Sequence, residues 1–493
     1  MNNRIAYVLG RTCFVSKVYV LSSVLMALNT IGCSREFVGK PSVPDQQFSA
    51  DRAGLTAGVS WWESFNQPIL NQLMKRVFDG NLAMKQAEER ALQLIHVAKQ
   101  VGSQRFPNVN LEAGWSRNKQ LNPFARLSNG PQPPGGGLPT SFEQDNYRLS
   151  LAVSYEIDLF GRISSLVAAA ERDAIAMEHD RIALGINLSA QVVEGWLTLI
   201  EIQERRALLI AQIDNEEALL TLSQSRYEEG LSPRVEYLQQ LQQRDRTKAN
   251  LPLLNAQEDV VRRQLALALG KTTLSNVQIP DALPDLPAAI SLGLPSKVLL
   301  NRPDIISAQA RLTAADSRVS AALSARYPAL RIGASAGVQS FEPAELFEDM
   351  IWGLSTNILA PIFQAGRLNA EQKRQEAVLR ERLHALNERL IIAYHEVENA
   401  LTNEEAQRTQ LTLIQAQLDS ALALEESALE RYLDGVGDFQ VYLAARQGSF
   451  AARLAQLNGR RSILSHRIAL YRSIAGSIPE DGQINANDTD NIQ

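Results

Sequence analysis

Cysteine is nearly absent from this chain of 493 residues, which has only Cys13 and Cys33. Both lie close to the N-terminus, so the rest of the chain can hold neither a disulfide scaffold nor a cysteine-based metal site. A chain of this length can fold around an apolar core without such cross-links. The scarcity of cysteine is therefore compatible with an exported protein.

Histidine is also scarce, and the usual signatures of catalysis are missing. His395-Glu396 begins like a zinc-binding helix, but Asn399 stands where the second histidine of H-E-x-x-H belongs. There is no nucleophile motif and no phosphate-binding loop, and the acidic residues fit solvated helix surfaces. We therefore expect no enzymatic activity, no cofactor and no metal. The histidines are scattered over helical stretches, at His96, His179, His384, His395 and His466.

Long apolar runs and an excess of positive charge are absent as well. Beyond residue 40 we find no run of about 18 apolar residues, so the sequence predicts no internal transmembrane helix. The net charge of −5 does not suggest a basic surface for nucleic acid. If the protein spans a membrane, it must do so with β-strands.

The N-terminus has the pattern of an export signal. Basic residues precede a mostly apolar stretch at 18–31, and Gly32 and Cys33 follow it. This order is typical of a signal peptide, which we place at residues 1–32.

The residues around Cys33 resemble a bacterial lipobox. Cleavage before Cys33 would make it a lipid attachment site, where acyl chains such as palmitate anchor a protein without spanning the bilayer. Thr30 stands where the motif usually has leucine, so ordinary cleavage that leaves Cys33 free is the alternative. Ser34 in place of aspartate favours outer-membrane sorting in lipoproteins. Residues 33–60 are then a lipid-anchored tether.

The body of the chain contains an internal repeat. Gly161-Arg162 recurs as Gly366-Arg367, a shift of 205, and Phe106-Pro107 recurs as Tyr327-Pro328, a shift of 221. In both halves an alternating apolar run leads to Gly-Arg, and a long proline-free run begins there. Such a repeat indicates duplication of a supersecondary unit. We divide the body into a first repeat (61–270), a crossover segment (271–296), a second repeat (297–475) and a polar, disordered tail (476–493).

Four segments alternate between apolar and polar residues with a period of two. Each is expected to form a strand with one apolar and one polar face, and a length of about ten residues suits a transmembrane β-strand. A Pro- and Gly-rich loop at 119–144 separates the first two, and an acidic loop at 342–349 separates the last two. The predicted strands are 109–117, 147–157, 330–338 and 352–358.

Each repeat also predicts a pair of long helices. Residues 162–230 lack proline, which predicts a helix on the order of 100 Å, and 367–434 has leucines at coiled-coil spacing. The return helices are expected at 234–269, with a break at Pro252, and at 438–475. Ser232 is the expected N-cap of the first return helix, with Pro233 at its first position.

Four strands cannot close a membrane barrel, since single-chain barrels start at about eight strands and open sheet edges do not survive in lipid. The chain must therefore pool strands with other copies, and three copies would give a water-filled barrel of twelve. The predicted fold is a mixed α/β membrane protein: a homotrimeric 12-stranded β-barrel, four strands per protomer, continued by a long α-helical coiled-coil barrel. A soluble sandwich and a cytoskeletal coiled coil are the alternatives.

Several motifs resemble those of the TolC-like outer-membrane efflux proteins, in particular the lipoprotein branch of resistance-nodulation-division (RND) systems. They are the L-P-S-K-V-L-L-N-R-P-D-I run at 294–305, D-L-F-G-R at 158–162, P-I-F at 361–363, and Trp62 with Phe65. The resemblance covers residues 33 to about 475. It implies an outer-membrane exit duct of a tripartite pump that passively conducts drugs or other small molecules.

The same resemblance implies partners. They are a periplasmic adaptor (membrane fusion) protein, an inner-membrane RND-type transporter, outer-membrane lipid and two further copies of the chain, but no nucleic acid. A duct for type I protein or peptide secretion is the alternative, and a periplasmic scaffold without a pore is the alternative of a different class.

By resemblance, the helix turns are the sites of adaptor docking, and the gate lies beside them. Many relatives carry an acidic residue in an L-D-A run, but here the run reads Leu443-Ala444-Ala445. Glu236, Asp434 and Asp438 are the candidate replacements in the gate, and ordinary solvated residues are the alternative. The predicted docking residues are Gly230, Leu231, Ser232, Pro233, Gly435, Val436, Gly437 and Asp438.

Overall fold

The computed structural model describes residues 60–121, 141–274, 277–288 and 295–474. All of them belong to one compact unit, Pro41–Gln493. The predicted signal peptide, Cys33, nearly all of the tether and the C-terminal tail lie outside the described residues, as do parts of the 119–144 loop and of the crossover segment.

Short helical elements open the described part of the chain. They are the 3-10 helix η1 (Trp61–Phe65), α1 (Pro68–Gly80), α2 (Leu82–Gly102) and η2 (Ser103–Arg105). Asn81 caps α2, because its side chain accepts a hydrogen bond from the Met84 amide at 2.9 Å. Proline at the first position of α1 costs nothing, since that amide has no helical partner.

Four antiparallel strands form a single sheet in the order β1-β2-β3-β4. β1 and β2 are longer than predicted, so residues 119–121 and 141–144 belong to strands and not to the loop. Lys119 pairs with Glu143 at 3.2 Å and Arg117 with Asp145 at 3.0 Å, and these cross-strand ion pairs extend the hairpin. The strand bounds are β1 Asn108–Leu121, β2 Ser141–Ile157, β3 Ala329–Ser340 and β4 Met350–Leu359.

The two hairpins have corresponding registers. Val109 pairs with Val153 in the first hairpin, and the shifts of 221 and 205 convert this pair into Leu330 and Ile358. These two residues are indeed paired in the second hairpin. The two halves of the sheet thus agree residue by residue.

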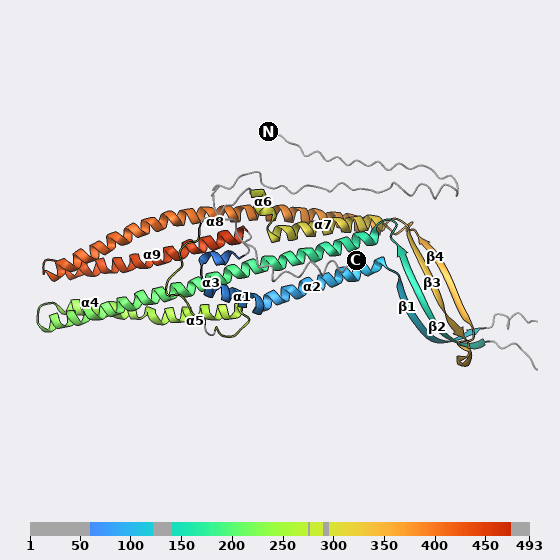
Figure 1. The fold of residues 1–493 in the computed structure, drawn as a ribbon, viewed down its shortest axis with the longest axis horizontal. Coiled ribbons are helices and arrows are strands. Elements are labelled where there is room, and N and C mark those ends of the chain that lie inside the picture. Colours follow the sequence, from blue (N-terminus) through green and yellow to red (C-terminus); the bar gives the residue numbers. More distant parts are fainter. Residues whose placement is uncertain (1–59, 122–140, 275–276, 289–294, 475–493) are drawn as a thin grey trace, which may run out of the picture. The chain divides into compact units, whose positions relative to one another are not determined.

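Long helices extend from the sheet (Figure 1). α3 and α8 each have 67 residues and begin at the repeated Gly-Arg. Each of them ends at a turn that lies at the opposite end from the sheet (Figure 1). The helices are α3 Arg162–Glu228, α4 Arg234–Lys248, α5 Asn250–Ala268, α6 Pro295–Leu300, α7 Pro303–Ser324, α8 Arg367–Leu433 and α9 Phe439–Ser473.

The first return helix differs from the prediction in detail. Its N-cap is Pro233, in an extended conformation, and not Ser232. The predicted break is present, but it falls at Ala249, between α4 and α5. Pro252 explains that position, because a proline ring collides with the carbonyl four residues earlier, which here belongs to Lys248.

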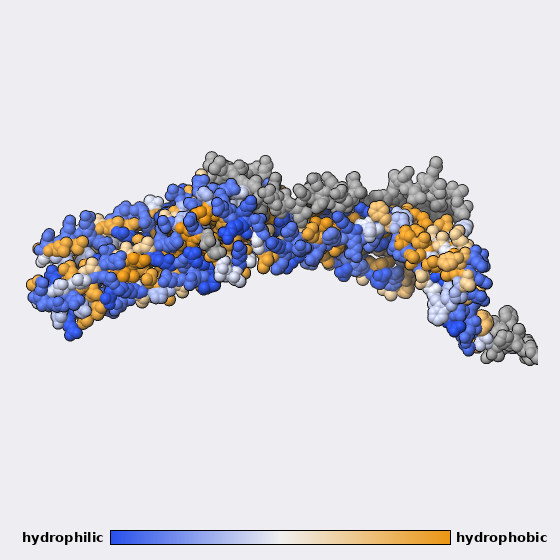
Figure 2. All heavy atoms as spheres, turned by 60° about the horizontal axis from the view of Figure 1, so that its bottom comes forward, coloured by the Kyte–Doolittle hydropathy of each residue, from blue (hydrophilic) through white to orange (hydrophobic). Residues whose placement is uncertain are grey.

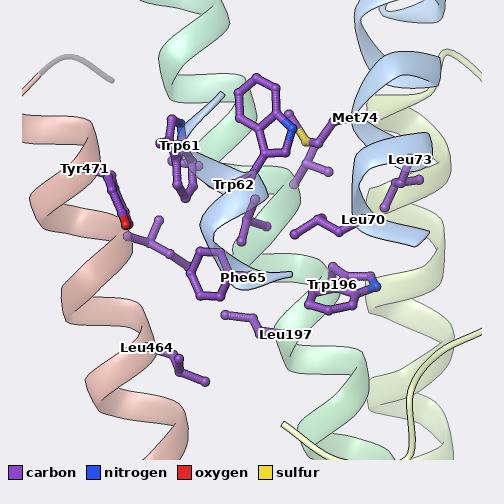
Figure 3. Packing of buried hydrophobic residues seen from close by; sticks show 14 of the residues in the cluster. Trp61, Trp62, Phe65, Leu70, Leu73, Met74, Trp196, Leu197, Leu464 and Tyr471 are labelled. Atoms are coloured by element: carbon purple, nitrogen blue, oxygen red, sulfur yellow. The ribbon is translucent and has the colours of Figure 1, made fainter. Parts of the chain in front are cut away.

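The main hydrophobic core lies midway along the long helices and includes the N-terminal aromatic residues. Trp61 of η1 stacks on Tyr471 of α9, with ring centroids 5.1 Å apart. In Figure 3, Trp196 and Leu197 of α3 face the same cluster, and both are 0% exposed. The core therefore joins the start of the described chain to its end.

A second cluster packs α7 against α8. It contains buried leucines of the predicted coiled-coil pattern, including Leu379, Leu386 and Leu390. That part of the prediction is confirmed.

By length and composition, α3 has one window apolar enough to cross a membrane, but 56% of that window is buried inside the fold. The main core contains residues of the same helix, so packing in the core accounts for this apolar composition.

Candidate functional site

One face of the sheet is apolar along all four strands from the helix junctions to the Trp115–Tyr147 pair, and beyond that pair the same face of β1 and β2 carries the ion pairs Arg117–Asp145 and Lys119–Glu143. Paired residues of an antiparallel sheet lie on the same face, so the register joins the apolar positions into one surface. Its side chains are exposed on the edge strands, where Leu111 is 69% exposed, Leu354 72% and Trp352 76%, and mostly half-buried on β2 and β3. Figure 2 shows hydrophobic residues gathered where the long helices meet the sheet. The face comprises Val109, Leu111, Ala113, Trp115, Tyr147, Leu149, Leu151, Val153, Tyr155, Ile157, Leu330, Ile332, Ala334, Ala336, Val338, Met350, Trp352, Leu354, Thr356 and Ile358.

The opposite face carries mostly polar or small residues, and Phe142, Ile351 and Leu359 are its apolar exceptions. Glu156 accepts from Arg162 at 2.6 Å and from Arg331 at 3.1 Å, which ties β2 to both α3 and β3. Arg148 donates to Ser150 at 3.3 Å. This face can contact water, whereas the apolar face cannot do so without cost.

The outer edges of the sheet are open. β1 pairs only with β2, and β4 pairs only with β3, among the residues that the structure describes. Unpaired strand edges attract further strands. Both edges and the apolar face therefore lack partners within the described chain.

The two junctions between sheet and long helix differ. At the first, Asp158 accepts from the amides of Ile163 (3.0 Å) and Ser164 (2.7 Å), which fixes the start of α3. At the second, Arg367 donates to the Gln364 side chain at 3.1 Å, and Ile362 and Phe363 are 92% and 86% exposed. Leu159 and Phe160 of the first junction are 53% and 46% exposed, so the apolar side chains of the second junction are the more exposed.

The two helix turns have the same backbone structure. Gly230 and Gly435 both have φ of +75°, the left-handed conformation that glycine adopts readily. The Leu231 amide donates to the Arg226 carbonyl at 2.8 Å, and the Val436 amide donates to the Arg431 carbonyl at 3.1 Å. Both turns are Schellman motifs. Leu231 and Val436 are 64% and 70% exposed, so the predicted docking residues form two projecting apolar tips.

The three candidate gate acids come from different elements near the tips. Asp438 is the N-cap of α9 and accepts from the Gln440 amide at 2.9 Å, whereas Asp434 ends α8 and Glu236 lies in the first turn of α4. Within the described part of the chain, no group of three or more His, Cys, Asp or Glu could hold a metal ion. The cap gives Asp438 a structural role that the sequence reasoning did not assign.

An aromatic cluster lies directly behind the tips. Tyr432 and Tyr442 stack with centroids 6.1 Å apart, and the Arg226 guanidinium lies 5.3 Å from the centre of the Tyr432 ring. Burial raises the pKa of the Tyr432 hydroxyl; Arg226 opposes this effect and Glu236 adds to it. Glutamine pairs link α4 to α9 nearby, Gln239 with Gln440 and, at 3.2 Å, Gln243 with Gln447. The halves are thus joined near the tips by glutamine pairs, by the contact of Arg226 with the Tyr432 ring and by the apolar packing of Leu219.

Sequence reasoning missed the buried ion pairs near the main core. Arg467 is 1% exposed and donates at 2.7 Å to Glu404, which is 0% exposed. Arg467 also donates to the Pro287 carbonyl at 2.6 Å, which holds the crossover segment against α9. No signal in the sequence could have matched these charges, because they lie far apart along the chain.

The motif run at 294–305 has a structural explanation. Arg302 is buried and donates to Asp304 at 3.0 Å, to Glu396 at 2.7 Å and to the Ser473 carbonyl at 2.6 Å. Burial opposes ionisation, but the carboxylate partners outweigh it and raise the pKa of Arg302. Arg302 therefore ties α7 to α8 and α9.

Known proteins share this architecture. OpmQ of Pseudomonas aeruginosa, a pyoverdine export outer membrane protein, is 28% identical over 440 residues, which cover 88% of this chain and 91% of that protein. TtgF of Pseudomonas putida, a toluene efflux pump outer membrane protein, is 28% identical over 425 residues, or 85% of this chain and 86% of that protein. The solved outer-membrane channel OprN has the same fold, with a TM-score of 0.80 and 24% identity over 89% of this chain and 98% of that one.

The family model for outer membrane efflux proteins matches residues 73–271 and 294–476. The second repeat (297–475) falls within the second range, and the first repeat (61–270) falls within the first range from residue 73 onward. The resemblance read from the motifs is thereby confirmed: the chain belongs to the outer membrane efflux protein family, and its place is the outer membrane.

Proposed function

We propose that the protein is the passive exit duct of a tripartite efflux pump, which conducts drugs or other small molecules across the outer membrane. The observation that carries this proposal is the sheet, which has one apolar face, one polar face and two open edges. Such a sheet is stable in lipid only when its edges are paired.

Three copies satisfy this requirement best. Two four-stranded sheets would give eight strands, which enclose little space, whereas three would give twelve, enough for an aqueous lumen. The apolar face then contacts lipid, and the polar face lines the lumen. Residues 147–157 of β2 have about the 9–11 residues that a tilted transmembrane strand needs. Trp115 and Tyr147 are paired where the apolar part of the face ends, which suits the aromatic girdle at a membrane interface.

The long helices then form a periplasmic tube that ends at the two tips. Leu231 and Val436 are exposed apolar residues on rigid turns, which is the chemistry expected of a protein docking site. We propose that the tips bind a periplasmic adaptor. An inner-membrane transporter of the RND class then supplies the energy for transport. A lipid on Cys33 would add a second anchor in the outer membrane.

The gate is assigned to the region beside the tips. Ala444 replaces the usual acidic residue, so the charge at the constriction must come from elsewhere, and Glu236, Asp434 and Asp438 are the candidates. Single-channel currents should change when all three are replaced by their amides. Unchanged currents would remove these acids from the gate.

Type I secretion of a protein or peptide is the second candidate function. Small-molecule efflux is favoured because OpmQ and TtgF are named for the export of pyoverdine and toluene. In a strain that lacks this protein, loss of a secreted polypeptide without accumulation of small molecules would favour secretion instead.

Conductance of the purified protein in planar bilayers tests the duct directly. Ala152 and Leu151 are neighbours on β2, and they lie on the polar and apolar faces respectively. A charged, water-soluble thiol reagent should reduce the current through Ala152→Cys and leave Leu151→Cys unchanged. Absence of conductance, or an equal response of both variants, would contradict the proposal.

A further inference from the structure

A cavity of about 590 Å³ lies where the sheet meets the long helices, at the junctions that begin α3 and α8 (Figure 1). Its lining combines charged side chains with aromatic and aliphatic ones, and both repeats contribute to it. Glu156, Arg331 and Leu359 of this lining belong to the polar face of the sheet. In the proposed duct that face lines the lumen, so the cavity lies beside the path of the cargo.

The arginines in the lining differ in their partners. Arg162 donates to Glu156 at 2.6 Å. Within the described chain, Arg331 donates only from Nε, to the same carboxylate at 3.1 Å, and Arg367 donates only to the side-chain oxygen of Gln364. A guanidinium has five N–H donors, and the Arg331 side chain is 59% exposed. Arg331 and Arg367 therefore have donors left for a further acceptor.

The carboxylates that line the cavity already have partners. Glu156 is shared by two arginines, Asp158 accepts from two backbone amides at the start of α3, and Glu371 pairs with Arg374 at 2.7 Å. The lining thus offers spare donors of positive charge and carboxylates that are already engaged. Guanidinium donors of this kind suit a carboxylate, sulfonate or phosphate group.

The internal repeat explains why the second junction has a cation without a carboxylate. The shift of 205 converts Arg162 into Arg367, but it converts Glu156 into Pro361. The first Gly-Arg therefore forms an ion pair inside the chain, whereas the second Gly-Arg binds a neutral amide. The two repeats have diverged at the position that decides the charge of the cavity.

Aromatic side chains form an apolar wall of the same cavity. Phe160 and Tyr327 stack with ring centroids 4.8 Å apart, and they are 46% and 49% exposed. An exposed ion pair by itself contributes little to binding, whereas apolar area removed from water adds to it. A ligand that binds here therefore needs both an anionic group and an apolar body.

We propose that this cavity binds organic anions with an apolar body, holding the anionic group at Arg331 and Arg367 and the body against Phe160 and Tyr327. The proposal rests on the proposed duct and adds a substrate class to it. Amphiphilic carboxylates, sulfonates or phosphates are then retained at the cavity on their way out, and cations of the same shape are not.

Block of the current in planar bilayers tests the site. Naphthalenesulfonate, an apolar ring with one anionic group, should reduce the current through the full-length protein. Naphthylmethylammonium has the wrong charge and methanesulfonate has no ring, so both should block less. Arg331→Gln with Arg367→Gln should raise the half-blocking concentration of naphthalenesulfonate by about tenfold or more, as expected for lost hydrogen bonds to a charged group. Arg367→Gln alone, at an exposed side chain, should give a smaller rise if the double variant fails to fold.

Arg148→Gln is the matched control. Arg148 lies on the same polar face, eight residues from Glu156 along β2 or roughly 27 Å away, and it donates to Ser150 at 3.3 Å. Its loss removes one positive charge from the same face but leaves the cavity intact. Block by naphthalenesulfonate should therefore stay within about twofold of the unaltered protein.

The outcomes separate the site from the duct. Equal block of the unaltered protein and the double variant, or an equal loss in Arg148→Gln, would overturn the site and leave the duct standing. If no form of the protein conducts, the proposed duct fails. Equilibrium dialysis of naphthalenesulfonate with the detergent-extracted protein then decides the site alone: weaker binding by the double variant supports it, and equal binding overturns it.

Discussion

Apolar side chains are buried in the middle of the long helices but exposed on the sheet. In the middle, Trp196 and Leu197 are 0% exposed and pack against η1, α1 and α9, whereas on the sheet Trp352 is 76% exposed. Both regions are rich in apolar residues, and both are well-ordered secondary structure. The chain itself completes the middle, whereas in the proposed barrel lipid and further strands complete the sheet.

Charged residues follow the same division. Arg467 and Glu404 are paired and almost wholly buried in the middle, and Arg302 is tied to three elements. Near the tips, the halves meet through glutamine pairs and through the contact of the Arg226 guanidinium with the Tyr432 ring. The middle is therefore expected to be the stable part of the fold, and the tips the part that adapts to a partner.

The largest effect is expected when the buried ion pair is broken. Arg467→Met removes the buried cation that binds both Glu404 oxygens and leaves that carboxylate with the more exposed Arg408 at 3.2 Å, which should lower the free energy of unfolding by up to about 3–5 kcal/mol. Lys248→Met is the control, because its ion pair with Glu217 lies at the surface, with both side chains nearly half exposed. Thermal unfolding in detergent should separate the two variants. Equal melting temperatures would contradict the assignment of the middle as the stabilising region.

A pair of leucine truncations separates stability from transport. Leu197→Ala in the core should cost about 2–5 kcal/mol. Leu231→Ala at the tip, where the side chain is 64% exposed, should leave stability unchanged and reduce efflux in cells. Melting curves and drug accumulation measured on both variants make the comparison. Normal efflux with Leu231→Ala would remove that residue from the docking surface.

The smallest effects are expected from two glycines near the second tip, and they should have opposite signs. A Cβ at Gly437 would lie 2.9 Å from the Arg431 carbonyl carbon and from the Tyr432 nitrogen, so Gly437→Ala should destabilise the turn by about 1–3 kcal/mol. Gly448→Ala meets no atom within 4 Å inside α9 and should stabilise the helix by about 0.5–1 kcal/mol. Hydrogen exchange in the tip should rise for the first variant only. Equal hydrogen exchange in the two variants would show that the turn accommodates a Cβ at Gly437 without a clash.

Most of the fold could be predicted from periodicity, because strands and long helices leave regular patterns. The four alternating runs, the Gly-Arg helix starts and the glycine turns all appear in the structure. Strand ends were less certain, because the extension of β1 and β2 depends on ion pairs between strands, such as Lys119 with Glu143. The N-cap at Pro233 instead of Ser232 is a similar local difference.

The candidate site could be predicted only in part. The tips follow from Gly230 and Gly435, since a left-handed residue ends each helix. The capping role of Asp438 and the pairing of Arg467 with Glu404 depend on side-chain positions that no pattern encodes. The gate acids stay a prediction for the same reason.

The central claim is that the sheet of one chain is completed by further copies. The mass of the detergent-extracted particle from outer membranes, measured by native mass spectrometry, tests this claim most directly. The account predicts about three times the protomer mass, because three sheets of four strands close a twelve-stranded barrel. A monomer, or a particle that stays soluble without detergent, would contradict it, since the open edges and the apolar face would then lack the partners that they require.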